Sequence, residues 1–438
     1  MSLNLRTSAP LRGECRLAGD KSLSHRVALL AALAEGESRI ENFLDAGVTR
    51  AMLDALAALG VEWELEKDVL LLQGKGPGGL RPPGEALHCG NSGTTLRLLA
   101  GALAGANVPC VLDGSPGLRT RPMDRIVKPL QAMGVPIEAA RGGTAPLSLS
   151  RRPNGVPLDA ISITLPVASA QVKSAILFAA LGADGTTTIK EPGPSRDHSE
   201  RLLKAMGVGI MRDANNLRVT LDPPAGPMRP LRLRLPGDFS SGAFLICAAL
   251  LIPRSDIVIR DIGLNPTRTG LIDALIAMGA AIDSQITGES YGEPIGDLRV
   301  QASKLHGTRI DGPLVVRMID EFPIFAIVAA MADGLSVVAN AEELRFKESD
   351  RIAVLSKELK GIGVDIEEMP DGFRIRGRRK LKGGVSVKSH GDHRLGMAFC
   401  IASLIADEPI LLEDAEIIDQ SFPEFSRHLE ELGAQVLV

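Results

Sequence analysis

The sequence predicts an α+β fold built from six α/β-type units, and three observations lead to this prediction. A polar or basic start, an apolar run and a β-prone segment recur six times. In step with them, a helix end, a glycine and a short strand recur every 70 to 84 residues, at Gly60, Gly134, Gly207, Gly279, Gly363 and Gly433. This period exceeds that of solenoids, so each unit forms a small subdomain. The chain of 438 residues, 45% of them apolar, is long enough for two or three domains, and six units divide into two sets of three.

The first unit opens with Gly-Asp-Lys-Ser-Leu-Ser-His-Arg at residues 19–26 and continues into the apolar residues 27–33. A helix that is apolar on every side is a buried helix, so we expect one here. Ser22 or Ser24 can cap its start. Residues 38–43 are typical of the strand that follows.

The start of each buried helix is a candidate anion site, because its free N–H groups and partial positive charge attract anions. Lys21 and Arg26 stand at the first of these starts, although an isolated lysine there is more often only solvated. The other five starts are residues 91–97, 169–173, 238–241, 320–323 and 393–394.

The remaining elements follow from the same patterns. Residues 3–5 and 15–17 suggest a strand pair ahead of the first helix, and residues 69–72 form a strand. Residues 223–230 resemble a connector between the two halves. Further helices are expected at residues 45–59, 124–133, 195–206, 265–278 and 343–362. The alternation predicts mixed sheets covered by helices rather than one parallel sheet.

Composition excludes several classes of protein. A net charge of −4 and an aromatic share of 3% argue against a nucleic-acid partner. The five cysteines show no CxxC spacing, so neither a zinc site nor a disulfide framework is expected. The first residues lack the apolar core of a signal peptide, and no apolar run is long enough to span a bilayer. We therefore expect a cytoplasmic protein with a small anionic ligand.

Three charged stretches are candidates for chemistry, and each has a structural alternative. Residues 345–351 place Lys347 and Arg351 on one helical face, or they form a solvated salt-bridged surface. Asp320 and Glu321 begin an apolar helix, where a carboxylate is either a plain helix cap or a general base. His393 is either a structural histidine or an acid or base. The loop at residues 91–95 lacks the P-loop pattern, and no GxGxxG follows a strand, so nucleotide chemistry is disfavoured.

Together these motifs resemble the 5-enolpyruvylshikimate-3-phosphate synthases, of the enolpyruvyl transferase family. The likeness covers essentially the whole chain. It is carried by residues 19–26, 90–95, 121–123, 169–173, 195–198, 265–270, 319–321, 347–351, 392–394 and 421–423.

The resemblance implies a two-domain inside-out α/β barrel of six βαβαββ-type repeats, three in each domain. Residues 1–18 and 237–438 would form one domain and residues 19–236 the other. The active site would lie in a cleft between them that closes on substrate and excludes water.

The resemblance also implies the reaction. Phosphoenolpyruvate would join the 5-hydroxyl of shikimate 3-phosphate by addition and elimination, with release of phosphate, in the route to chorismate and the aromatic amino acids. The catalytic residues would be Asp320 as the base for the hydroxyl, Lys347 beside it, Glu348 as the proton donor to the methylene carbon, Lys21 and His393. Which of Lys347 and Glu348 handles each proton stays open.

Binding residues carry over by motif as well. Shikimate 3-phosphate would be held by Lys21, Ser22, Arg26, Ser169, Ala170, Gln171, Ser195, Arg196, Asp320 and Lys347. Phosphoenolpyruvate would be held by Lys21, Asn91, Gly93, Arg121, Gln171, Arg351 and Arg394, since arginine suits bidentate contacts with carboxylates and phosphates. Glyphosate, a phosphoenolpyruvate mimic in this family, should fit beside Gly93.

The resemblance implies no metal and no organic cofactor, no nucleic acid, no membrane and a monomer. Two alternatives remain. The first is a UDP-N-acetylglucosamine enolpyruvyl transferase, whose mobile loop normally carries a cysteine that residues 115–122 lack. The second is a non-catalytic anion-binding protein on the same scaffold, against which Asp320, Lys347 and Glu348 argue.

The chain departs from the family pattern at several positions. Ala18 replaces a proline, and Gly47-Val48 replaces an acidic pair found in many members. Glu343 and Gln420 stand where some members have asparagine and lysine, and the latter change removes one potential cation from the phosphoenolpyruvate pocket.

Overall fold

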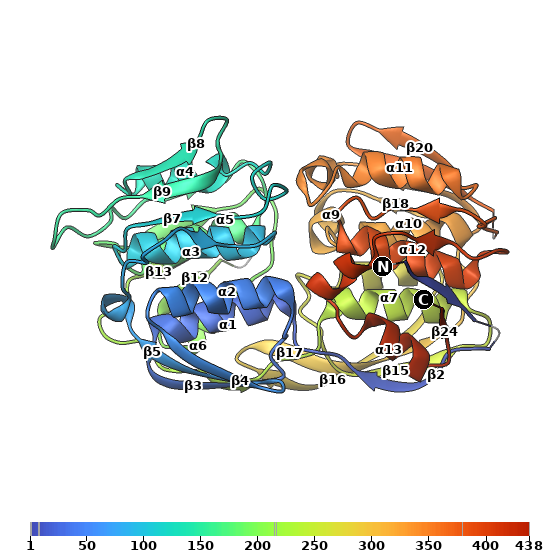
Figure 1. Ribbon diagram of the computed structural model, residues 1–438, viewed down its shortest axis with the longest axis horizontal. Coiled ribbons are helices and arrows are strands. Elements are labelled where there is room, and N and C mark those ends of the chain that lie inside the picture. The colour runs from blue at the N-terminus through green and yellow to red at the C-terminus, as the bar shows by residue number, and fades with distance from the viewer. Residues whose placement is uncertain (1, 8, 214, 216, 379, 438) are drawn as a thin grey trace. The chain divides into compact units, whose positions relative to one another are not determined.

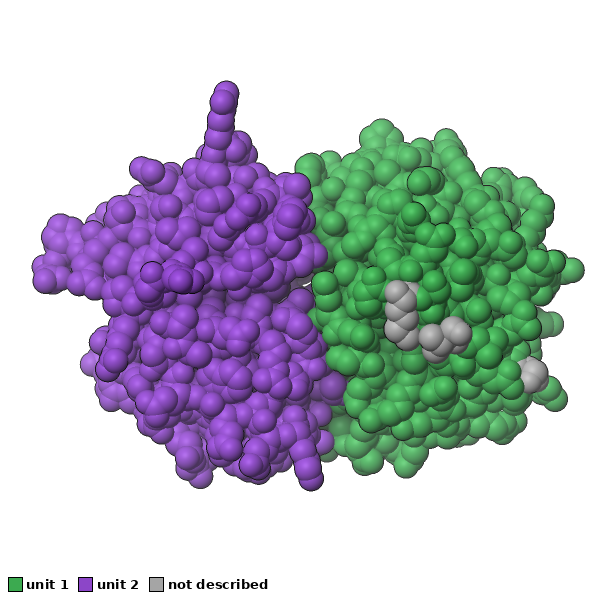
Figure 2. Space-filling model, in the orientation of Figure 1, with its two compact units in different colours: residues 1–17, 237–288, 294–438 green, residues 18–236, 289–293 purple. Residues whose placement is uncertain are grey.

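The computed structural model describes residues 2–7, 9–213, 215, 217–378 and 380–437. Two compact units divide the chain (Figures 1 and 2). Unit 1 comprises Met1–Leu17, Gly237–Gly288 and Pro294–Val438. Unit 2 comprises Ala18–Pro236 together with the short segment Glu289–Glu293. No sequence pattern indicated that this short segment belongs to unit 2.

Three four-stranded sheets occur among the described residues of unit 2, in the orders β14-β3-β5-β4, β6-β7-β9-β8 and β10-β11-β13-β12. In each, the first two strands are parallel and the other pairs antiparallel. The strands are β3 (Glu35–Glu41), β4 (Glu62–Glu66), β5 (Val69–Lys75), β6 (Leu87–His88), β7 (Cys110–Asp113), β8 (Ile137–Ala140), β9 (Thr144–Leu149), β10 (Ser162–Thr164), β11 (Thr187–Lys190), β12 (Gly209–Arg212), β13 (Arg218–Asp222) and β14 (Arg232–Arg234).

The helices of unit 2 are α1 (Lys21–Leu33), α2 (Gly47–Ala58), α3 (Gly93–Gly105), α4 (Asp124–Ala132), α5 (Ala170–Ala180) and α6 (His198–Ala205), with a 3₁₀ turn at Pro77–Gly79. Helices α1, α3 and α5 are buried along almost their whole length, and α3 packs against both α1 and α5 (Figure 1). Their even apolar character therefore marks interior helices, and their polar groups lie in the first two turns.

Unit 1 contains two four-stranded sheets, β16-β17-β15-β2 and β18-β19-β21-β20, and the strand pairs β22-β23 and β1-β24, in the part of the chain that the structure describes. The strands are β1 (Asn4–Arg6), β2 (Arg12–Arg16), β15 (Asp256–Gly263), β16 (Ala281–Ser290), β17 (Glu293–Gln301), β18 (Arg309–Ile310), β19 (Gly334–Val338), β20 (Asp365–Met369), β21 (Gly372–Gly377), β22 (Ser386–Val387), β23 (Leu411–Leu412) and β24 (Gln435–Leu437).

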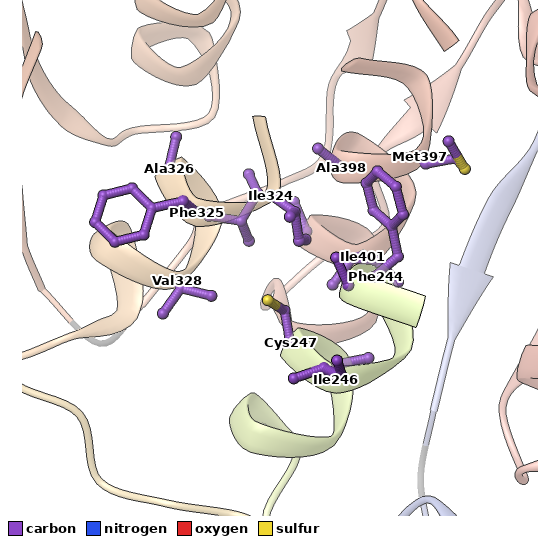
Figure 3. Close-up of a cluster of buried hydrophobic side chains, with 14 of the residues drawn as sticks. Phe244, Ile246, Cys247, Ile324, Phe325, Ala326, Val328, Met397, Ala398 and Ile401 are labelled. Carbon is purple, nitrogen blue, oxygen red and sulfur yellow. The ribbon is translucent and has the colours of Figure 1, made fainter. Parts of the chain in front are cut away.

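The helices of unit 1 are α7 (Phe239–Leu251), α8 (Gly270–Ala277), α9 (Pro313–Arg317), α10 (Phe322–Met331), α11 (Arg351–Gly361), α12 (His393–Ile405) and α13 (Phe425–Glu431), with 3₁₀ turns η2 (Glu342–Phe346) and η3 (Ala415–Gln420). Helices α7, α10 and α12 pack against one another. Figure 3 shows side chains of all three helices in one buried cluster, among them Cys247 of α7, Ile324 of α10 and Ile401 of α12. This packing fixes the three helix starts in one place.

The predicted pairing of residues 3–5 with residues 15–17 is wrong. Strand β1 pairs antiparallel with β24, and β2 pairs parallel with β15. Strand β2 forms the edge of the sheet β16-β17-β15-β2, whereas β1 and β24 form a separate two-stranded pair. In both cases the partner comes from the second half of the chain and satisfies backbone N–H and C=O groups of the short strand. In the described ranges, no helix combines the length and the apolar character that crossing a bilayer requires.

Candidate functional site

The start of α1 is capped by Asp20, not by Ser22 or Ser24 as predicted from the sequence. The Asp20 carboxylate accepts a hydrogen bond of 2.9 Å from the Leu23 N–H. The Ser24 hydroxyl instead accepts one of 3.3 Å from the Leu44 N–H. Lys21 and Ser22, both half-buried, are therefore the first residues of the helix, at the end where its dipole favours anions.

Arg26 lies one turn further along α1 and is buried. Its guanidinium donates to the hydroxyls of Ser199 (2.8 Å) and Ser174 (3.0 Å) and to the Ser22 carbonyl (2.9 Å). Burial lowers the pKa of Arg26 to about 10, although the Glu200 carboxylate opposes this shift. A cation held mainly by neutral groups is well suited to accept an anionic ligand.

His25 connects the start of α1 to the start of α3. Its Nδ1 lies 2.7 Å from the Lys21 carbonyl, and its Nε2 lies 3.2 Å from the Ser92 hydroxyl and 3.2 Å from the Val48 carbonyl. Ser92 in turn caps α3 through the Thr95 N–H at 3.1 Å. Burial lowers the pKa of His25 to about 4, so the ring is neutral near pH 7.

Gly93 is the first residue of α3, and two guanidinium groups crowd it. A Cβ atom at this position would lie 3.1 Å from Arg121 Nη1 and 3.2 Å from Arg97 Nη1. Arg97 also donates to the Gln171 side-chain oxygen, and Gln171 Nε2 donates to the Thr94 hydroxyl at 2.9 Å. Only a residue without a side chain fits here while the arginines stay in place.

The other predicted residues of unit 2 lie at neighbouring loops and helix starts. The Asn91 side chain accepts a hydrogen bond of 3.1 Å from the Ser115 hydroxyl. Ser169 caps α5 through the Val172 N–H at 3.5 Å, which places Ala170 at the first helical position. Ser195 is buried, and its hydroxyl has no hydrogen-bond partner among the described residues. A buried polar group in this state is suited to a ligand.

These residues together form the unit-2 cluster. Its members are Lys21, Ser22, Arg26, Asn91, Gly93, Arg97, Arg121, Ser169, Ala170, Gln171, Ser195 and Arg196. Arg196 stands close enough to Arg26 that its charge helps to lower the Arg26 pKa.

In unit 1, the fully buried Arg351 holds three carboxylates together. Its guanidinium lies 2.7 Å from Asp392, 2.9 Å from Glu348 and 3.5 Å from Asp320. Burial alone lowers the pKa of Arg351, but the carboxylates, Asp392 foremost, raise it by more, so it ends above its ordinary value. Arg351 is therefore a permanent cation next to Asp320 and Glu348.

Arg394 contacts Asp320 from the first turn of α12. Its guanidinium lies 3.7 Å from the Asp320 carboxylate and 3.3 Å from the Asp320 backbone carbonyl. Asp392 caps α12 by accepting from the Arg394 N–H at 3.0 Å. His393 is the first residue of this helix and is also buried. We call Asp320, Glu321, Lys347, Glu348, Arg351, Asp392, His393 and Arg394 the unit-1 cluster.

The predicted helical face shared by Lys347 and Arg351 is wrong. The chain forms the 3₁₀ turn η2, is extended at Lys347 with φ −86° and ψ −153°, and begins α11 only at Arg351. Asp350 ends the extended segment because its carboxylate caps α11 at the Ala353 N–H. The solvated-surface alternative fits Arg345, which pairs with Asp350 and Glu368, and fails for the buried Arg351.

The cap alternative for Asp320 is also wrong. Helix α10 begins at Phe322, its cap position is Glu321, and no side chain hydrogen-bonds to its first N–H groups. The Asp320 carboxylate, with 17% of its side chain exposed, points instead to Arg351 and Arg394. This leaves Asp320 available as an acid or base.

Sequence reasoning assigned no role to Arg97 or Asp392, although both stood inside motifs. Arg97 is four residues after Gly93, so it lies on the same face of α3 one turn later. This i, i+4 spacing could have indicated from the sequence that Arg97 lies near Gly93. Asp392 directly precedes an apolar helix, which is the usual place for a capping aspartate. Its second partner, Arg351, comes from a distant segment and had no local signal.

Apart from Ala18, the residues that depart from the family pattern lie in or at the ends of α2, η2 and η3. Gly47 is the first residue of α2, and the Val48 carbonyl lies 3.2 Å from His25 Nε2 and accepts from the Thr95 hydroxyl at 3.4 Å. Glu343 lies in η2, and Gln420 is the last residue of η3. Within the described ranges, no group of three or more histidine, cysteine, aspartate or glutamate side chains is arranged to hold a metal ion.

Comparisons of this chain with family models, with curated sequences and with solved structures all find similarity to the same enzyme family. A family model described as EPSP synthase (3-phosphoshikimate 1-carboxyvinyltransferase) matches residues 5–429. The 3-phosphoshikimate 1-carboxyvinyltransferase of Desulforudis audaxviator (strain MP104C) is 46% identical over 434 residues, 99% of each chain. That of Bacillus subtilis (strain 168) is 42% identical over 426 residues, 97% of each chain. The EPSP synthase structure from Acinetobacter baumannii superimposes with a TM-score of 0.86 at 38% identity, covering 100% of this chain and 99% of that one.

Proposed function

The chain belongs to the EPSP synthase family, the 3-phosphoshikimate 1-carboxyvinyltransferases, and we infer that it transfers the enolpyruvyl group of phosphoenolpyruvate to the 5-hydroxyl of shikimate 3-phosphate. Inorganic phosphate is the second product, and the reaction serves aromatic amino acid biosynthesis. The resemblance drawn from the motifs is confirmed. We propose the following division of roles between the two clusters.

The unit-2 cluster binds shikimate 3-phosphate. Lys21, Ser22 and Arg26 supply cations and a hydroxyl at one helix start, and Ser195 and Arg196 supply the same groups before another. Ser169, Ala170 and Gln171 hold the polyol from the start of α5. The buried Arg26, kept cationic but surrounded by hydroxyls, supports this role because a phosphate would supply the negative charge.

Phosphoenolpyruvate is held by residues of both clusters. Lys21, Asn91, Gly93, Arg121 and Gln171 contribute from unit 2, and Arg351 and Arg394 contribute from unit 1. The phosphate and the carboxylate each need a bidentate cation, and arginine supplies that geometry. The guanidiniums around Gly93 support this assignment.

The unit-1 cluster moves the protons, with Lys21 as a further catalytic group. Asp320 accepts the proton of the 5-hydroxyl as its oxygen attacks C2 of phosphoenolpyruvate, while Glu348 or Lys347 protonates the C3 methylene. Removal of one proton from the resulting methyl group then expels phosphate and restores the double bond. His393 at the start of α12 assists this exchange. The guanidiniums of Arg351 and Arg394 lie 3.5 and 3.7 Å from the Asp320 carboxylate, and neighbouring positive charges favour the ionised form that a general base requires.

We further propose the finer architecture that the family implies. The two units correspond to domains of residues 1–18 plus 237–438 and residues 19–236, each made of three βαβαββ-type repeats in an inside-out α/β barrel. The recurring strand order of the four-stranded sheets supports the repeats. The protein acts as a cytoplasmic monomer, without metal or organic cofactor.

One observation carries the mechanism: Asp320 lies between the guanidiniums of Arg351 and Arg394. The test is phosphate release from phosphoenolpyruvate, with shikimate 3-phosphate or UDP-N-acetylglucosamine as the acceptor. We expect release only with shikimate 3-phosphate, and a loss of about 10²- to 10⁴-fold in kcat for Asp320→Asn. Asp297→Asn is the matched control, because this similarly exposed carboxylate pairs with Arg260 in unit 1 and should keep full activity.

Release with the sugar nucleotide would move the protein to the sister transferases. Binding of both substrates without turnover by the folded wild-type protein would instead support the anion-binding alternative. Full activity in Asp320→Asn would remove Asp320 from the role of base and leave the transfer itself standing.

A further inference from the structure

Glu321 occupies a helix-cap position without capping the helix. It directly precedes α10, and its side chain makes no hydrogen bond to the first N–H groups of that helix. Pro323, at the second helical position, has no N–H to be capped. The carboxylate nevertheless is fully buried, with 0% of its side chain exposed. Burying a charged carboxylate costs free energy unless its partners compensate the charge. The contacts of Glu321 must therefore offset this cost.

The partners of Glu321 come from the starts of two other helices. The Ser240 hydroxyl, in the first turn of α7, donates to Glu321 Oε1. Arg394 Nη1, in the first turn of α12, lies 3.8 Å from the same oxygen. Both contacts follow from the packing of α7, α10 and α12.

The Ser240 hydroxyl also accepts a hydrogen bond from the buried Arg268. Arg268 Nη2 lies 3.0 Å from the Ser240 hydroxyl and 2.8 Å from Asp238 Oδ1, the carboxylate that caps α7. Arg268 is buried and its charge is balanced by Asp238. A continuous polar chain therefore runs from Arg268 through Ser240 and Glu321 to Arg394. It turns the Ser240 hydroxyl so that its proton points at Glu321.

The Arg394 guanidinium lies near two carboxylates, with Nη1 3.8 Å from Glu321 and Nη2 3.7 Å from Asp320. Neither distance is that of a close charge-assisted hydrogen bond. With both carboxylates present, the guanidinium is shared between them. If Glu321 lost its charge, Asp320 would be the stronger attractor and would draw Arg394 into a closer pair.

We propose that Glu321 is a positioning residue that keeps Arg394 away from a close pair with Asp320, so that the guanidinium can receive an anionic group of phosphoenolpyruvate and Asp320 can receive a proton. This inference rests on the proposed function, because it takes Arg394 as a phosphoenolpyruvate contact. Glu321 itself touches no substrate and acts through Arg394, with Ser240 and Arg268 fixing its orientation.

The test compares Glu321→Gln with Glu321→Asp in steady-state kinetics. The glutamine keeps the volume and loses the charge, so we expect KM for phosphoenolpyruvate to rise about tenfold while KM for shikimate 3-phosphate stays unchanged. Aspartate keeps the charge and should restore KM to within about threefold of wild type. A purely structural role would lower stability and both substrates' parameters together, without rescue by aspartate.

A second pair of variants tests the polar chain. Ser240→Ala removes the donor to Glu321 and should raise KM for phosphoenolpyruvate, less than Glu321→Gln does. Ser403→Ala is its matched control, since Ser403 is an equally buried serine of unit 1 whose hydroxyl donates to the Leu5 carbonyl. It should reduce the unfolding midpoint and leave both KM values unchanged.

The outcomes separate this inference from the function on which it rests. If Arg394→Lys raises KM for phosphoenolpyruvate and Glu321→Gln behaves like wild type, the positioning role is overturned and the transfer reaction stands. If wild-type protein fails to release phosphate, or if Arg394→Lys leaves KM unchanged, the assignment of Arg394 falls and the inference falls with it.

Discussion

Single residues decide how closely an anion can approach the start of α3. Gly93 leaves room for two guanidinium groups, and its missing side chain is the feature that permits their approach. Because Arg97 and Arg121 are held from different segments, an added atom at residue 93 must displace at least one of them. The contact distances near 3 Å make that displacement a matter of tenths of an ångström.

We predict that Gly93→Ala raises KM for phosphoenolpyruvate and weakens inhibition by glyphosate, while KM for shikimate 3-phosphate is unchanged. The methyl group would meet Arg121 Nη1 and Arg97 Nη1 at 3.1 and 3.2 Å. Steady-state kinetics with glyphosate as the varied inhibitor measures both effects. Gly101→Ala is not a suitable control, because its Cβ would lie 2.0 Å from the Ala175 carbonyl in the core. Gly226→Ala, where nothing lies within 4 Å, should change neither constant.

His25 makes unit 2 sensitive to acid. Its folded pKa is about 4 against an ordinary 6.5 because burial disfavours the charged ring. The unfolded chain therefore binds the proton more readily, so stability is full above pH 6.5 and is lost as the pH falls from 6.5 to 4. The shift corresponds to a loss of about 3 kcal/mol at the acid end.

The measurement is the urea midpoint at pH 7 and at pH 4.5, for wild type and for His25→Gln. We expect the variant to be less stable at pH 7, since the bonds to Lys21, Val48 and Ser92 are altered, and to lose less stability on acidification. His88→Gln replaces an exposed histidine of the same unit and should keep the wild-type pH dependence. A variant that loses as much stability as wild type would contradict the role of His25.

At the scale of elements, the helix starts carry the function, and the sequence predicts them better than it predicts their partners. The apolar runs predicted the buried helices because burial on all sides leaves a strong local signal. The extended segment at Lys347 was missed, since the capping of α11 by Asp350 overrides the helical propensity of the residues before it. The partners of β1 and β2 were missed because they lie more than 200 residues away, and pairing at that distance leaves no local pattern.

The same limit applies to the candidate site. Motifs identified Asp320, Arg351 and Arg394 as individual residues, but nothing in the sequence indicated that Arg351 would be fully buried between Asp392 and Glu348. Nor did it show that Arg97 would reach Gln171. Such contacts depend on how helix starts from separate segments meet, which is set by the packing of the apolar runs behind them.

Asp392 joins two elements, because it caps α12 and pairs with Arg351 at the start of α11. We predict that Asp392→Asn lowers the free energy of unfolding by about 3–5 kcal/mol, because it removes one partner of a fully buried ion pair. Asp350→Asn is the matched control, since Asp350 caps α11 and pairs with the partly exposed Arg345. Its loss should be below about 1 kcal/mol. Because asparagine caps a helix about as well as aspartate, equal losses measured by urea unfolding would show that the buried pair contributes no more than the exposed one.

At the scale of the whole molecule, the two units have separate hydrophobic cores. One core includes Phe325 and Phe244 of unit 1, and the other includes Ile176 and Leu29 of unit 2. Each core is closed by its own buried helices and sheets, although the chain passes from unit 1 to unit 2 and back. A protein built in this way need not unfold in a single two-state step.

We therefore predict two calorimetric transitions. Phe325→Ala should lower one of them and Ile176→Ala the other, with costs of about 3–5 and 2–5 kcal/mol respectively, because each removes fully buried atoms from only one core. A ligand should act on the two transitions unequally as well. Most of the residues proposed for shikimate 3-phosphate lie in unit 2, so this ligand alone should raise chiefly the midpoint of the unit-2 transition, the one that Ile176→Ala lowers. At a ligand concentration a hundred times its Kd, the free energy of unfolding of that unit should rise by about 2.7 kcal/mol. A single transition lowered equally by both variants would mean that the cores unfold as one, and a rise confined to the Phe325-sensitive transition would place shikimate 3-phosphate on the other cluster.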